Sequence, residues 1–181
     1  MMMSENKTPK LFEIGHPATE YILEWWKNLA HNKGDSAEIR RCKSLSEIEL
    51  TSAYQRFYWG FLKTFKTEEW KPSQEKTALF IALIVYIKED KRSYQNDKNE
   101  AAFDYFAYQI SQGEKPKLSE LRFRRLLKIT DNEKLFRFLI QVIRLLDRKV
   151  NLLDLIKITY YWNDETRKYL AYKYYEKANL T

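Results

Sequence analysis

Residues 117–149 read KLSELRFRRLLKITDNEKLFRFLIQVIRLLDRK. Apolar residues recur in this stretch every three or four positions, which is the spacing of one face of an α-helix. Ser119 is a favoured N-cap residue for a helix ending near Ile129, and Asp131 with Asn132 begins a longer helix ending near Lys149. The buried face of the longer helix is expected to contain Leu135, Phe138, Leu139, Val142, Ile143 and Leu146.

The rest of the chain has the same helical spacing. Capping boxes are expected at Asp35 with Glu38 and at Ser44 with Glu47, and Asn151 and Asp164 are expected to cap the last two helices. No segment shows the period-two alternation of a strand. We therefore expect an all-α fold of about nine helices in two small packed bundles. The predicted helices cover residues 17–31, 35–43, 44–65, 73–87, 101–112, 119–129, 131–149, 152–162 and 164–175.

A polar segment at residues 88–100 separates the two predicted bundles. We expect a flexible leader at residues 1–15, an N-terminal helical lobe at 16–100 and a C-terminal helical lobe at 101–181. No internal repeat of fixed period is visible, which argues against a solenoid.

Composition excludes several classes of protein. One cysteine in 181 residues cannot form an intramolecular disulfide, which favours a reducing compartment. The N-terminus lacks the apolar segment of a secretory signal, and the longest apolar run, residues 79–87, is far shorter than the roughly 20 residues of a transmembrane helix. The sequence thus predicts a soluble cytoplasmic protein without a membrane partner.

The positive charge of the chain is concentrated in one place. Lys and Arg number 32 and Asp and Glu 25, a net charge of +7. Residues 117–149 contain ten basic and four acidic residues, so this stretch alone carries +6. Within its second helix the residues Lys134, Arg137, Gln141, Arg144 and Arg148 are expected to form one line. In its first helix, Arg122 with Arg125 and Arg124 with Lys128 are expected to be exposed pairs.

A charged stripe on a helix is often only a solvated surface. This one has a single sign and is rich in arginine, whose planar guanidinium matches phosphate oxygens in pairs. The pattern therefore favours binding to a nucleic-acid backbone. Arg40 and Arg41 form a second, smaller basic group.

Residues suited to catalysis are few. His16 and His31 have no visible catalytic partner, and Cys42 is interpreted as a structural thiol. Motifs for nucleotide binding, zinc binding or a serine nucleophile are absent from the sequence. We expect the protein not to be an enzyme and to have no cofactor and no metal site.

The C-terminal aromatic residues are expected to be mainly core, with one or two lining a nucleic-acid path or a subunit contact. They are Tyr160, Tyr161, Trp162, Tyr169, Tyr172, Tyr174 and Tyr175.

Three blocks of sequence are similar to a known family. The first is Trp25-Trp26-x-x-Leu29 followed by Gly34-Asp35-x-Ala37-Glu38-Ile39-Arg40-Arg41, and the second is Leu118-Ser119-Glu120-x-Arg122-Phe123-x-Arg125-Leu126-Leu127. The third is Leu155 with Tyr161-Trp162 and Ala171-x-x-Tyr174-Tyr175. Together these blocks resemble the CasB family, the small subunit of the type I-E CRISPR effector complex Cascade.

The resemblance implies a non-catalytic helical subunit that is present as two copies in a ribonucleoprotein. Its implied partners are guide RNA, target DNA, the second copy of itself, and the large, backbone and guide-processing subunits. Its implied role is to hold nucleic-acid backbone and stabilise the R-loop in antiviral defence. By position in the blocks, backbone contacts are expected from Arg40, Arg41, Arg122 and Arg125. The charge pattern adds Lys128, Arg137, Arg144 and Arg148, and the candidate set is completed by Lys43, Arg124, Arg167 and Lys168.

Two other functions fit the sequence. A helical interaction module could dock an acidic protein through the same basic face without binding nucleic acid. A sequence-specific DNA regulator is the third interpretation, although no helix-turn-helix signature is legible.

Overall fold

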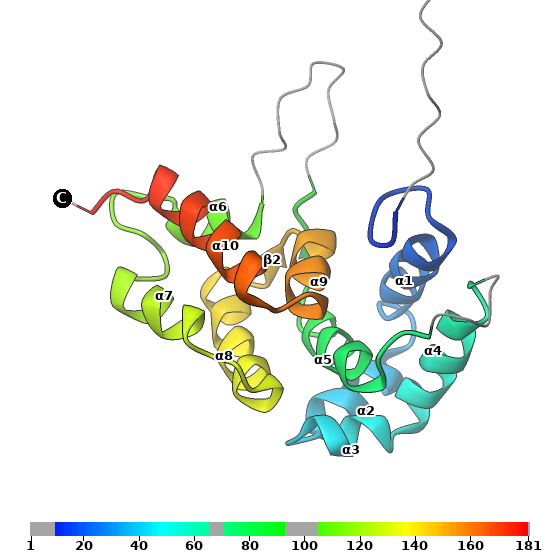
Figure 1. Ribbon diagram of the computed structural model, residues 1–181. Helices are drawn as coiled ribbons and strands as arrows, with labels where there is room; N and C mark the ends of the chain where they lie inside the picture. Colours follow the sequence, from blue (N-terminus) through cyan, green and yellow to red (C-terminus); the bar gives the residue numbers. More distant parts are fainter. Residues whose placement is uncertain (1–9, 66–70, 93–104, 181) are drawn as a thin grey trace, which may run out of the picture.

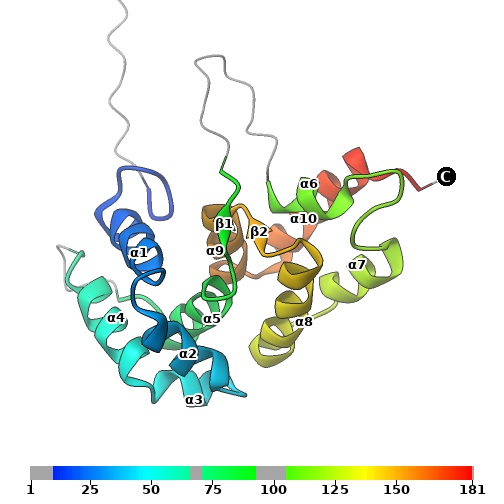
Figure 2. The same cartoon turned by 180° about the vertical axis from the view of Figure 1, so that it is seen from behind.

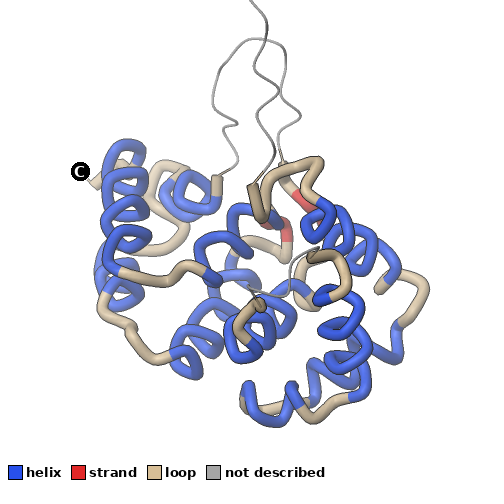
Figure 3. The backbone as a smooth tube through the Cα atoms, turned by 45° about the vertical axis from the view of Figure 1, so that its right-hand side comes forward, coloured by secondary structure: helices blue, strands red, loops and turns tan. Residues whose placement is uncertain are grey.

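The computed structural model describes residues 10–65, 71–92 and 105–180, and within these ranges it contains ten α-helices and two very short strands (Figures 1, 2 and 3). The all-α prediction is confirmed. None of the described helices is long and apolar enough to cross a membrane. The elements are α1 Pro17–Asn28, α2 Lys33–Arg41, α3 Leu45–Glu49, α4 Ser52–Leu62, α5 Gln74–Ile84, β1 Glu89–Asp90, α6 Phe106–Ser111, α7 Glu120–Leu127, α8 Asn132–Leu145, β2 Lys149–Val150, α9 Leu152–Tyr160 and α10 Asp164–Lys177.

Helix α5 lies at the centre of the molecule. Every residue from 77 to 87 is buried, so α5 has no solvent face beyond its first turn. It packs against α3 and α4 on one side and against α8 and α9 on the other (Figures 1 and 2). The ring of Phe80 contacts Phe57 and Phe61 of α4 and Tyr160 of α9, with centroid distances of 6.1, 6.0 and 6.3 Å. One aromatic core therefore joins helices from both halves of the sequence.

A short parallel pairing of β1 and β2 was not predicted. Glu89 pairs with Lys149 and Asp90 with Val150, and the Lys88 amide donates a hydrogen bond to the Arg148 carbonyl at 2.8 Å. The pairing connects the segment after α5 to the segment after α8 by main-chain hydrogen bonds. Two-residue strands are too short to show alternation in a sequence, which explains why they were missed.

The helix predicted at residues 44–65 is two helices. Thr51 interrupts it: the Thr51 hydroxyl donates to the Ile48 carbonyl at 2.7 Å and accepts from the Tyr54 amide at 3.1 Å. This side chain ends α3 and caps α4, because a threonine hydroxyl can replace a main-chain partner at a helix end. The predicted cap at Ser44 is confirmed, since its hydroxyl accepts from the Glu47 amide at 3.1 Å.

Two other predicted caps are wrong by a few residues. Helix α2 begins earlier than Asp35: Asn32 is its N-cap and accepts from the Asp35 amide at 3.3 Å. Glu38, the predicted partner of Asp35, instead accepts hydrogen bonds from Ser52 and Ala53 at the start of α4. Helix α10 is capped by Asn163 in place of Asp164. The caps at Asp131 and Asn151 are confirmed.

The predicted boundary between two lobes, near residue 100, lies outside the described residues, as does the predicted leader up to residue 9. Most of the helix predicted at 101–112 is described, as α6. Within residues 10–15, Phe12 is buried against Phe80 and Tyr160. The division into two lobes stays a prediction.

Candidate nucleic-acid interface

The predicted basic line on α8 is present over most of its length. Lys134, Arg137, Gln141 and Arg144 are all exposed on the side of α8 opposite its buried residues. Among those buried residues are Leu135, Leu139, Val142 and Ile143, as the helical spacing predicted. Packing of this apolar face fixes the direction in which the cations point.

Arg148 does not belong to this helix. Helix α8 ends at Leu145, and Asp147 and Arg148 have positive φ angles of 54° and 60°. The Arg148 amide donates to the Ile143 carbonyl at 2.9 Å, and the Arg148 carbonyl accepts from Lys88 in the pairing of β1 with β2. The sequence prediction extended the helical line one turn too far, because the tight left-handed turn contains no glycine or proline to signal it.

Helix α7 carries a second group of cations. Phe123 and Leu126 are its buried residues, and Arg122, Arg124, Arg125 and Lys128 are exposed. The indole NH of Trp162 donates to the Ile129 carbonyl at 2.7 Å, which fastens the short connection between α7 and α8.

The acidic residues of this region do not neutralise the cations. Glu120 accepts from the Tyr175 hydroxyl at 3.0 Å, Asp131 caps α8, and Glu133 accepts from the Leu45 amide at 2.5 Å. Within the part of the chain that the structure describes, no ion pair forms with any exposed basic residue of α7 or α8. These side chains therefore keep their charge available for a phosphate partner.

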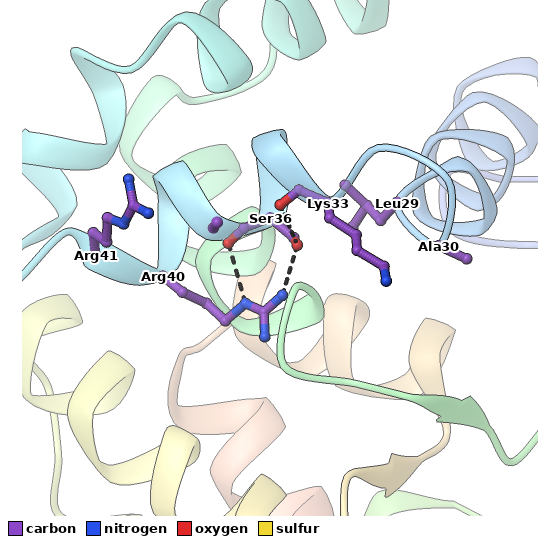
Figure 4. Close-up of a pocket in the computed structure, with 7 residues that line it drawn as sticks. Leu29, Ala30, Lys33, Ser36, Arg40 and Arg41 are labelled. Atoms are coloured by element: carbon purple, nitrogen blue, oxygen red, sulfur yellow. Dashed lines mark hydrogen bonds between the residues drawn. The ribbon is translucent and has the colours of Figure 1, made fainter.

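A third basic group lies at the C-terminal part of α2, where Arg40, Arg41 and Lys43 are exposed. An open hollow of about 570 Å³ is lined there by Leu29, Ala30, Lys33, Ser36, Ala37, Arg40 and Arg41, with no acidic residue in the lining. Arg40 and Lys33 extend to the same side of α2, and Arg41 extends to the other (Figure 4). The Arg40 guanidinium donates to the Ser36 carbonyl at 3.1 Å and to the Ser36 hydroxyl at 2.6 Å, which holds it in place.

Tyr86 joins the α2 group to the α8 line. Its hydroxyl donates a long hydrogen bond to the Arg40 carbonyl at 3.5 Å, and the Arg144 guanidinium lies 5.7 Å from the centre of its ring. This contact between a cation and an aromatic face keeps Arg144 beside the end of α2. Tyr86 was not predicted from the sequence, because its neighbours Arg40 and Arg144 are far from it in the chain. Lys33 was also missed, although its neighbours in the hollow all lie within residues 29–41.

Arg167 and Lys168 differ in what they are free to bind. The Arg167 guanidinium pairs with Asp164 and donates to the Leu127 carbonyl at 3.3 Å, so it connects α10 to α7. Lys168 is exposed. We therefore leave Arg167 out of the proposed contacts and keep Lys168.

The three residues considered for catalysis have other surroundings. His16 caps α1 through its Nδ1 atom, which accepts from the Ala18 amide at 3.1 Å, while His31 is an exposed turn residue. Burial, followed by the charges of Glu47 and Glu38, raises the pKa of the Cys42 thiol. Within residues 10–65, 71–92 and 105–180, no three side chains of His, Cys, Asp or Glu are grouped to hold a metal.

Comparison with known proteins gives two findings. Residues 35–175 match the family described as CRISPR-associated protein Cse2, and no curated protein matches the chain. Among solved structures, the chain is similar to a chain in the crystal structure of E. coli Cascade bound to a PAM-containing double-stranded DNA target, with a TM-score of 0.55 and 16% sequence identity. The similarity covers 92% of this chain and 99% of that chain, so the two share a fold.

Proposed function

Because the chain belongs to the CRISPR-associated Cse2 family, we propose that it is a non-catalytic subunit of a Cascade ribonucleoprotein and binds nucleic-acid backbone through α2, α7 and α8. Cse2 is the family also called CasB, so the resemblance seen in the sequence is confirmed. The proposed partners are guide RNA, target DNA, a second copy of this chain, and the large, backbone and guide-processing subunits. The proposed role is to lengthen the lifetime of the R-loop.

One observation supports this proposal above the others. The exposed arginines and lysines of α7 and α8 are unpaired among the described residues, although four acidic residues occur in the same stretch of sequence. Like charges held together repel one another, so an arrangement without compensating acids favours an anionic ligand. The contacts of Tyr86 extend this surface toward Arg40.

The test compares charge removal on this surface with equal charge removal elsewhere. The interface variant carries Arg122→Gln, Arg137→Gln and Arg144→Gln. The control variant carries Lys27→Gln, Lys63→Gln and Lys71→Gln, which are exposed residues outside α7 and α8. Affinity for single-stranded DNA is measured over a series of salt concentrations, and R-loop lifetime is measured in the assembled complex.

The slope of log affinity against log salt concentration measures the number of phosphate contacts. Each lost contact makes this slope shallower by about 0.7 for a single strand, so we expect the interface variant to make it shallower by about 2. Its R-loop should also dissociate faster. The control should keep both values of the unmodified protein. Equal effects of the two variants, or an unchanged R-loop lifetime with loss of another protein subunit, would contradict backbone binding and support docking to an acidic protein.

A further inference from the structure

Helix α10 carries three partly or largely exposed tyrosines, and one of them, Tyr172, takes no part in the packing of the described helices. Leu170 and Tyr174 are its buried residues. Tyr172 is 80% exposed, and Tyr169 and Tyr175 are 40% and 42% exposed. Among the described residues no hydrogen bond or ring contact involves Tyr172. Tyrosines are large amphipathic side chains that normally bury much of their surface, so one that is 80% exposed and flanked by two others suggests a ligand.

Helix α10 runs alongside α7 in the opposite direction (Figure 1). The rings of Tyr174 and Phe123 stack with centroids 3.8 Å apart, and the Tyr174 hydroxyl donates to the Leu118 carbonyl at 2.7 Å. Near the other end of α7, Arg167 donates to the Leu127 carbonyl. These contacts fix which side of α10 faces α7, and they leave Tyr172 pointing to solvent.

The aromatic face borders one exposed cation of α7, Arg124. Tyr175 donates to Glu120 and lies close enough to Arg124 for that charge to lower its pKa, against larger raising effects from burial and from Glu120. Lys168 stands one helical turn before Tyr172 and is exposed. Tyr169, by contrast, is turned toward α6 and α9, where burial and then the charge of Asp154 raise its pKa to about 12. The aromatic surface nearest to the cations is therefore Tyr172 with Tyr175.

We propose that Tyr172 and Tyr175 are a stacking platform for the bases of a single-stranded nucleic acid whose phosphates bind Arg124 and Lys168. This inference rests on the proposed function and adds to it a contact with bases. Aromatic rings and cations lie side by side on this surface, and a single strand can contact both, because it exposes flat base faces together with phosphates. A duplex stacks its base faces inside, so we infer a single strand as the ligand. Because every base has such a face, the platform accepts any sequence.

The experiment uses the full-length protein and two probes of equal length and equal phosphate number. One probe is oligo-thymidine and the other is the same oligonucleotide without bases. The variants are Tyr172→Leu, which removes the ring, and Tyr172→Phe, which keeps it. Tyr172 is chosen because its substitution breaks no hydrogen bond within the described structure.

For oligo-thymidine we expect Tyr172→Leu to weaken binding by about fivefold or more, as one base–aromatic stack contributes about 1 kcal/mol or more. Tyr172→Phe should bind within about twofold of the unmodified protein. Neither variant should differ from it on the probe without bases, and the salt dependence should be unchanged because no charge is removed.

Unchanged oligo-thymidine binding by Tyr172→Leu would overturn the platform while leaving the proposed function to its own charge-removal test. An equal loss on both probes would also overturn it, because the effect would not depend on bases. Loss of another subunit from the complex, with oligo-thymidine binding intact, would assign the tyrosines to a protein contact. Failure of the unmodified protein to bind either probe would overturn both proposals.

Discussion

Asp154 is a half-buried carboxylate that connects two helices. It lies in the first turn of α9, and its side chain accepts a hydrogen bond from the Phe106 amide at 2.7 Å, at the start of α6. Burial raises the pKa of Asp154 to about 6, although the Phe106 bond and the charge of Lys157 act to lower it. The carboxylate is thus charged at neutral pH in a place that disfavours charge.

Replacement of Asp154 should show how much its charge lowers the free energy of unfolding at each pH. The pKa is about 6 in the folded state and 3.8 in the unfolded state, so the folded state binds the proton more tightly and stability falls as pH rises from about 4 to about 6. We expect Asp154→Asn to abolish this slope and to match the unmodified protein near pH 4. Above pH 6 it should be more stable by up to about 3 kcal/mol. Urea unfolding at several pH values measures this.

Asp154→Ala separates the hydrogen bond from the charge. It leaves the Phe106 amide without its acceptor and should destabilise the fold by about 1–3 kcal/mol relative to Asp154→Asn at every pH. An Asn variant less stable than the unmodified protein at pH 7 would show that the charge itself stabilises this junction.

At the scale of helices, Glu38 connects α2 to α4. Its carboxylate accepts hydrogen bonds from the amides of Ser52 and Ala53 and from the Ser52 hydroxyl, at 3.1 to 3.3 Å. Burial alone would raise the pKa of Glu38, but these hydrogen bonds and the charge of Arg56 outweigh it and hold the pKa below its ordinary value. Glu38 therefore caps a helix from outside that helix.

The contribution of Glu38 to stability should change with pH in the opposite direction to that of Asp154. A lowered carboxyl pKa contributes stability that is present above the unfolded-state pKa and is lost as pH falls through the folded-state pKa. We expect Glu38→Ala to cost about 1 kcal/mol at pH 7 and progressively less as pH falls below 4.5, the ordinary pKa of a glutamate. Glu24→Ala, which removes an exposed glutamate on the neighbouring helix α1, is the control. A penalty for Glu38→Ala that does not change with pH would exclude the carboxylate as the capping group.

The sequence predicts helices well and their junctions less well. The burial of Leu135 and Leu139 and the caps at Asp131 and Asn151 follow from local spacing, which short-range physics controls. The break at Thr51 and the role of Glu38 depend on contacts between segments that become neighbours only after folding. The same limit applies to the candidate interface: the exposed cations of α7 and α8 were predictable, but the meeting of Arg40 with Arg144 at Tyr86 was not.

At the scale of the whole molecule, the distribution of charge indicates a binding surface better than the net charge does. A charge of +7 on 181 residues is modest, yet +6 of it occurs in the 33 residues that form α7, α8 and their flanks. The aromatic core around α5 holds these helices against the N-terminal ones, so the basic groups of α2 and α8 are kept at a fixed separation. We expect a surface held in this way to lose little entropy on binding the proposed nucleic acid.

Phe80 provides a test of whether the two halves of the chain depend on one another. Its fully buried ring touches aromatic rings of α4 and α9, on opposite sides of the predicted lobe boundary. We expect Phe80→Ala to lower the free energy of unfolding by about 3–5 kcal/mol and amide exchange in α4 and α9 to rise together, because both helices lose the same packing partner. Hydrogen exchange read by mass spectrometry in low urea resolves the two helices. Phe136→Ala, in α8 and outside this ring cluster, is the matched control and should affect α8 first. Faster exchange in α4 alone after Phe80→Ala would mean that the lobes unfold independently, and the separation between the α2 and α8 cations would then not be fixed by the core.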